Sequence, residues 1–81
     1  MDITINNFKN LIHVIAMNGL KYWDEYGLDI YDEKISLELD RSRHQQAISL
    51  KYAIKNRQSI INKPGGNQLI QYTANKILHN N

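Results

Sequence analysis

Apolar side chains recur every three or four positions along most of this chain, the spacing that places them on one face of an α-helix. The first such run occupies residues 7–26 and is followed by Gly27, a residue type that commonly ends a helix. Its apolar face is made of Phe8, Leu11, Ile12, Ile15, Gly19, Tyr22, Trp23 and Tyr26. The pattern predicts one long helix over residues 7–26.

Helical spacing returns in two later stretches. The stretch 42–62 begins with Ser42 and Gln45 at the spacing of a capping box, and it ends before Pro64, which cannot continue a helix. Its expected inner face consists of Ala47, Leu50, Ala53, Ile54, Ile60 and Ile61. The stretch 67–79 carries its inner face at Ile70, Thr73, Ala74, Ile77 and Leu78. These patterns predict a second and a third helix.

Residues 35–39 follow a different rule, because apolar and polar side chains alternate there as in a half-buried strand. A strand needs a partner, and the alternating residues 2–5 are the available candidate. The sequence therefore predicts a mainly α, compact three-helix domain over residues 1–81, to which the pattern adds a minor β ribbon of residues 2–5 and 35–39.

Length and composition restrict the class of protein. A chain of 81 residues without cysteine has neither a disulfide nor a thiolate metal site, which fits a reducing compartment. Its longest apolar stretch, Leu11–Met17, is much shorter than the ~20 residues that span a bilayer. The start, Met1-Asp2, lacks the basic segment of a signal peptide. We therefore expect a cytoplasmic protein without a membrane partner.

Charge is distributed unevenly along the chain. All 8 acidic residues lie within the first 40 positions, together with 3 lysines, which gives that part a net charge of −5. The remainder carries 7 lysines and arginines and no acid. Uncompensated cations attract anionic partners through Coulomb forces and counterion release. The basic half therefore predicts nucleic acid or an acidic protein surface as a partner.

The predicted second helix gives this charge a geometry. At 100° per residue, polar and basic side chains form a stripe away from the apolar face, interrupted by Ile48 and adjacent to Tyr52. The candidate anion-binding residues are Arg41, Arg43, His44, Lys51, Lys55, Gln58 and Asn62. Such a stripe can follow a phosphate backbone while its amides contact bases or sugars. The alternative is an ordinary solvated face.

Two arginines lie at the expected start of this helix. Cations are unfavourable there because they face the positive end of the helix dipole. Together with free backbone N–H groups, the segment 41–44 is a candidate phosphate site. Pairing of Arg41 and Arg43 with Glu38 and Asp40 is the alternative explanation.

The acidic half carries the aromatic residues. Carboxylates around them disfavour stacking on nucleic-acid bases. The candidate protein-binding residues are Trp23, Tyr26, Asp29, Tyr31, Asp32 and Glu33. They form either the closed end of the core, with polar tips in water, or a hot spot that recognises a basic protein surface.

A second apolar patch on the first helix, Val14, Met17 and Leu20, is either covered by the third helix or forms a homodimer contact. Catalytic signals are absent, since the three histidines stand isolated and no carboxylates have a shared-site or calcium-loop spacing. We therefore expect no enzyme, no cofactor and no metal.

These observations favour a small non-enzymatic regulatory protein that binds nucleic acid or a nucleoprotein complex through its basic helix. The first alternative is an inhibitor or adaptor of the kind encoded by phages or mobile elements, which binds a host protein directly. The bias toward isoleucine and asparagine over alanine, as AT-rich codons produce, is compatible with such an origin. The second alternative is a structural subunit of an oligomer.

Overall fold

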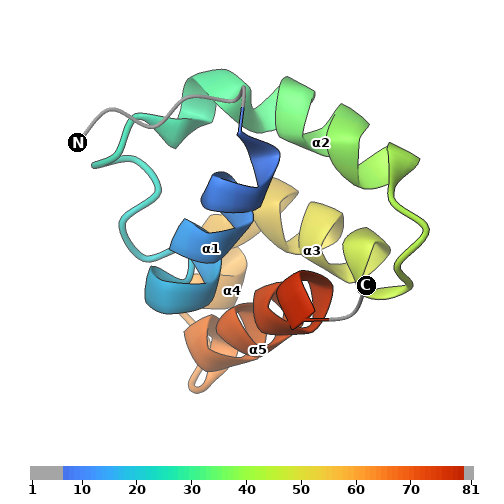
Figure 1. The fold of residues 1–81 in the computed structure, drawn as a ribbon. Helices are drawn as coiled ribbons and strands as arrows, with labels where there is room; N and C mark the ends of the chain where they lie inside the picture. The colour runs from blue at the N-terminus through green and yellow to red at the C-terminus, as the bar shows by residue number, and fades with distance from the viewer. Residues whose placement is uncertain (1–6, 80–81) are drawn as a thin grey trace.

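Residues 7–79, the part of the chain that the computed structural model describes, form five α-helices and one short 3-10 helix joined by turns and short connections (Figure 1). In order they are α1 (Phe8–Asn18), η1 (Leu28–Tyr31), α2 (Asp32–Arg41), α3 (Gln46–Lys55), α4 (Arg57–Ile61) and α5 (Gly66–His79). The prediction of a mainly helical, compact fold is confirmed. The predicted number of three helices is wrong, and the reasons differ from one helix to the next.

The first helix ends at Asn18 rather than at residue 26. Gly19 takes a left-handed φ of 66°, and Asn67 at the start of α5 supplies hydrogen bonds on both sides of it. The Asn67 Oδ1 atom accepts from the Leu20 N–H at 2.9 Å, and its Nδ2 donates to the Asn18 carbonyl at 3.2 Å. Residues 20–27 then form successive turns. A side chain distant in sequence therefore fixes where α1 ends.

The predicted strand at residues 35–39 is wrong, because these residues lie inside helix α2. Alternating apolar positions also contain an i, i+4 pair, and in the helix Ile35 and Leu39 are buried while Leu37 is exposed. Asp32 in the first turn lies near the positive end of the helix dipole, and Arg41 in the last turn lies near its negative end, so both charges stabilise the helix. The proposed partner strand, residues 2–5, lies outside the described residues.

The predicted helix over residues 42–62 is two helices with a later start. Ser42 has an extended backbone after α2, and its hydroxyl accepts from the His44 N–H instead of closing a capping box. The His44 Nδ1 atom accepts from the Gln46 N–H at 3.1 Å, so a histidine just before the N-cap residue Gln45 satisfies the first N–H of α3. Asn56, with φ −114° and ψ 28°, separates α3 from α4. The third predicted helix, 67–79, agrees with α5 to within one residue.

The core forms where the helices cross. The helix α1 packs along α5, while α3 packs against both α2 and α5 (Figure 1). Aliphatic side chains at the predicted helical faces fill the interior, together with Trp23 and Leu28 from the turns. The fully buried large side chains are Trp23, Leu11, Ile12, Ile15, Leu20, Leu28, Ile35, Leu50, Ile54 and Ile70.

Candidate functional site

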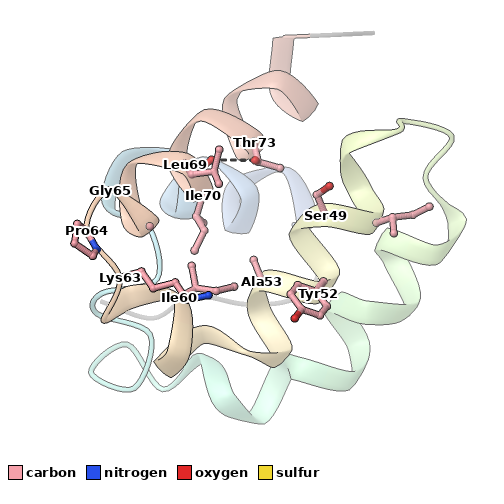
Figure 2. Close-up of a pocket in the computed structure, with 12 residues that line it drawn as sticks. Ser49, Tyr52, Ala53, Ile60, Lys63, Pro64, Gly65, Leu69, Ile70 and Thr73 are labelled. Atoms are coloured by element: carbon pink, nitrogen blue, oxygen red, sulfur yellow. Dashed lines mark hydrogen bonds between the residues drawn. The ribbon is translucent and has the colours of Figure 1, made fainter.

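An open groove of about 630 Å³ lies between α5 and the pair α3–α4. Figure 2 shows Ile70 pointing from α5 toward Ile60 and Ala53 on the opposite wall. The lining residues are Ile48, Ser49, Tyr52, Ala53, Ile60, Lys63, Pro64, Gly65, Gly66, Leu69, Ile70 and Thr73. Nearly all of this lining is apolar, and Lys63 is the charged residue among it.

The turn between α4 and α5 closes one end of the groove. Gly65 takes a left-handed φ of 77°, which reverses the chain after Pro64. A Cβ atom at Gly66 would lie 1.9 Å from the Ile60 carbonyl oxygen, so only glycine permits this approach of α5 to α4. The sequence Pro-Gly-Gly therefore forms one end of the groove.

Large apolar side chains remain exposed along this groove. Ile48 is 78% exposed, Tyr52 66% and Leu69 63%. Scattered exposed hydrophobic residues are ordinary, but a group around one concave surface is typical of an interaction site. The signal in the sequence was indirect: Ile48 interrupts the polar stripe, and Leu69 lies outside the predicted inner face of its helix.

Polar groups in the groove are few, and some of them are already bonded within the chain. The Thr73 hydroxyl donates to the Leu69 carbonyl at 2.9 Å, shown as the dashed line in Figure 2. The Gly66 N–H donates to the Lys63 carbonyl at 3.0 Å. The groove surface is therefore mainly apolar, and its remaining polar side chains are Ser49, Tyr52 and Lys63.

The acidic half of the chain folds against the basic half at Arg57. This side chain is 18% exposed and is surrounded by three carboxylates, those of Asp24, Asp29 and Asp32. Its Nη1 atom donates to Asp32 Oδ2 at 3.1 Å and to the Ile54 carbonyl at 2.9 Å, and its Nη2 atom donates to Asp29. Arg57 is not among the site residues that the sequence predicts, because no local pattern shows that three acids converge on it.

One of these carboxyl groups has a shifted pKa. The neighbouring Asp29, through a shared hydrogen bond, raises the pKa of Asp24 above 3.8, while Arg57 acts in the opposite direction. A carboxyl group whose pKa is higher in the folded state than in the unfolded state stabilises the fold at pH values below its unfolded pKa. That stabilisation is lost as the pH rises through the folded pKa. Asp29 and Arg57 therefore act on the Asp24 carboxyl group in opposite directions.

The predicted anion-binding stripe is partly neutralised. Lys51 Nζ lies 2.6 Å from Asp40 Oδ1, and Arg41 Nη1 lies 3.2 Å from Glu38 Oε1, as the pairing alternative anticipated for Arg41. Gln58 is within 3.5 Å of an Asp24 oxygen.

The rest of the stripe divides between surface and structural positions. Arg43, Lys55 and Asn62 are exposed, and no ion pair of these two cations is found within residues 7–79. Lys55 nevertheless lines a small depression together with Asp32 and Glu33. His44 contributes Nδ1 to the α3 cap, and its buried Nε2 has no partner among the described residues.

The aromatic residues of the acidic half also divide. Trp23 is 2% exposed in the core, with the Arg57 guanidinium 5.5 Å from its ring centre, which agrees with the core alternative. Tyr26 meets Tyr22 edge to face at 6.3 Å, and Tyr31 is half-buried against the core. The buried tryptophan presents no surface to a partner. Asp29 and Asp32 hold Arg57, as described above, while Glu33 is exposed.

Because α1 ends at Asn18, the three residues of the candidate dimer patch do not lie on one helix face. Leu20 is fully buried because the chain turns inward after Gly19, and Val14 is half-buried. Met17 alone of the three is exposed, at 64%. These three side chains therefore do not form a continuous outward surface.

Within residues 7–79, no three histidine or acidic side chains lie close enough to hold a metal ion, and none of the helices there combines the length and hydrophobicity needed to cross a bilayer. Comparison of the chain with protein-family models, with curated proteins and with solved structures finds no match.

Proposed function

We propose that this chain is a non-enzymatic binding protein that takes up an apolar segment of a partner protein in the groove between α3, α4 and α5. The observation that carries the proposal is the exposure of Ile48, Tyr52 and Leu69 around one apolar hollow. Apolar surface of this kind is stabilised by a partner that removes it from water. This corresponds to the inhibitor or adaptor alternative from the sequence.

Pairing among its own residues weakens the case for nucleic acid. Two cations of the predicted stripe and Arg57 are engaged by acids of the same chain. Counterion release requires cations that are available to phosphates. The groove, in contrast, has no competing contact within the described residues.

The groove can be tested with a library of helical peptides displayed on phage and selected on the immobilised protein. The double variant Ile48→Ser, Leu69→Ser is expected to lose about tenfold or more in affinity for the selected peptides, since buried interface anchors contribute over about 1 kcal/mol each. Its melting temperature should shift by no more than about 8 °C, because each of the two exposed positions changes stability by about 0.5 kcal/mol or less.

Leu37→Ser is the matched control, since Leu37 is 52% exposed on α2, away from the groove. It should bind the selected peptides like the wild type. A selection that yields no peptide able to distinguish the wild type from the double variant would refute binding in the groove.

Nucleic-acid binding remains the second candidate, because residues 41–79 contain no acid while Arg43, Lys55 and Lys63 lack an ion pair within the described residues. If these three cations meet phosphates, the slope of log K against log[salt] should be about −3, from about 0.9 per phosphate. Lys55→Gln should reduce the slope by about 1, whereas Lys51→Gln, a residue already paired with Asp40, should leave it unchanged. No binding to any DNA or RNA at low salt would eliminate this candidate.

A further inference from the structure

The three helices that enclose the groove contain no acidic residue. Residues 46–79 carry lysine and arginine but neither aspartate nor glutamate. The acids that neutralise Lys51 and Arg57 come from the turns after α1, from η1 and from α2, and none of them lines the groove. Positive charge therefore remains on the groove side of the molecule.

Two lysines lie toward opposite ends of the α5 wall, and of these Lys63 lines the groove itself. Lys63 lines the end formed by the turn before α5. Lys76 is seven residues beyond Leu69, so the two share one side of α5, and its ammonium group lies 5.3 Å from the ring centre of Tyr72. Because an α-helix rises about 1.5 Å per residue, Gly66 and Lys76 lie about 15 Å apart along the axis of α5, nearly three helical turns. A cation therefore lines one end of the groove, and a second one lies on α5 about one turn beyond Thr73, the last residue of that helix in the lining.

The shape of the groove favours a helix over an extended strand. An extended segment needs a sheet edge or free polar groups to satisfy its backbone, and residues 7–79 form no strand. The groove walls are built from helices and a turn, and the side-chain hydroxyls of Ser49 and Tyr52 do not form the row of backbone partners that an extended strand requires. A helix satisfies its own backbone and presents apolar side chains at i, i+3, i+4 and i+7.

We infer that the occupant of the groove is an amphipathic helix of a partner protein, apolar along one face and carrying carboxylates near both ends of that face, where they meet Lys63 and Lys76. This inference rests on the proposed function and specifies its partner. Apolar anchors supply the affinity, while the two charge contacts fix the orientation and select acidic over basic helices.

The peptides selected from the phage library provide the probe. They are expected to be enriched in aspartate and glutamate on either side of their apolar face. The double reversal Lys63→Glu, Lys76→Glu should weaken synthetic copies of these peptides about tenfold, measured by fluorescence anisotropy, and in a fresh selection it should shift the enrichment toward lysine and arginine. The control Lys34→Glu, an exposed residue on α2, should leave affinity within about twofold.

The outcomes separate the two levels of the proposal. Peptides that depend on Ile48 and Leu69 but show no acidic enrichment, or that bind the double reversal as well as the wild type, would overturn the acidic helix and leave the groove function standing. Peptides that bind without adopting a helix, by circular dichroism of the complex, would likewise overturn it. Absence of any groove-dependent peptide would overturn both.

Discussion

Replacing Trp23 with alanine is expected to lower the free energy of unfolding by about 3–5 kcal/mol, the range for truncating a large aromatic side chain in a core. The ring is 2% exposed and lies beside the Arg57 guanidinium, so the variant loses packing and a cation–π contact together. For a domain of this size the melting temperature should fall by at least about 12 °C. Urea denaturation followed by far-UV circular dichroism measures the change.

Trp23→Phe provides the graded control, because it keeps an aromatic ring in the same cavity and should cost distinctly less. If the alanine variant does not fold, the stability of the phenylalanine variant still tests the prediction. We expect stability to decrease in the order wild type, Trp23→Phe, Trp23→Ala. A decrease of less than about 1 kcal/mol in the free energy of unfolding for Trp23→Ala would contradict the core position and indicate a tryptophan at the surface.

Replacing Arg57 with methionine is expected to cost about 2–3 kcal/mol. Methionine retains much of the apolar stem but removes the charge that holds three carboxylates and the bond to the Ile54 carbonyl. Removing one partner of a fully buried pair costs about 3–5 kcal/mol, and the exposure of the surrounding acids reduces that figure by solvent screening. Arg41→Met is the matched control, because its pair with Glu38 is exposed on both sides and should contribute no more than about 0.5 kcal/mol.

The cost of Arg57→Met should depend on pH in a defined direction. Arg57 lowers the pKa of Asp24, so its removal raises that pKa further above 3.8. A group with a raised folded pKa stabilises the protein below its unfolded value and loses that contribution as the pH rises. The difference between variant and wild type should therefore be larger at pH 7 than at about pH 3.5. Equal differences at both pH values, or equal costs for Arg57→Met and Arg41→Met, would contradict the central role of this arginine.

These contacts change the interpretation of the charge pattern in the sequence. Separation of acids and bases along the chain indicated an unopposed basic half, yet folding places Asp40 on Lys51 and three aspartates around Arg57. Part of the pattern therefore stabilises the domain. The remaining positive charge includes Lys63, which lines one end of the groove, and Lys76, farther along α5.

Prediction from the sequence was accurate for the buried faces and poor for the ends of the helices. Leu11, Ile15, Leu50, Ile54 and Ile70 were placed in the core by their spacing and are fully buried. Spacing alone did not place the end of α1 or the break at Asn56, because the apolar pattern continues across both. The strand prediction failed because a short alternation contains helical spacing as well.

The candidate site was less predictable still. The basic stripe was found by counting cations along one helix face, but whether each cation is free depends on acids from other elements. Tyr52 was noticed as a neighbour of the stripe, and Leu69 was not selected. Both became candidate site residues only when α5 was placed opposite α3.

The sequence by itself determined the helical class and most of the core, because the spacing of apolar residues determines which side of a helix is apolar. Tertiary structure decided the rest: the end of α1 at Gly19 through Asn67, the pairing of Arg57 with three distant aspartates, and the apolar groove between three helices. Each of these requires residues far apart in the chain to meet, and contacts of that kind leave no local pattern in a single sequence.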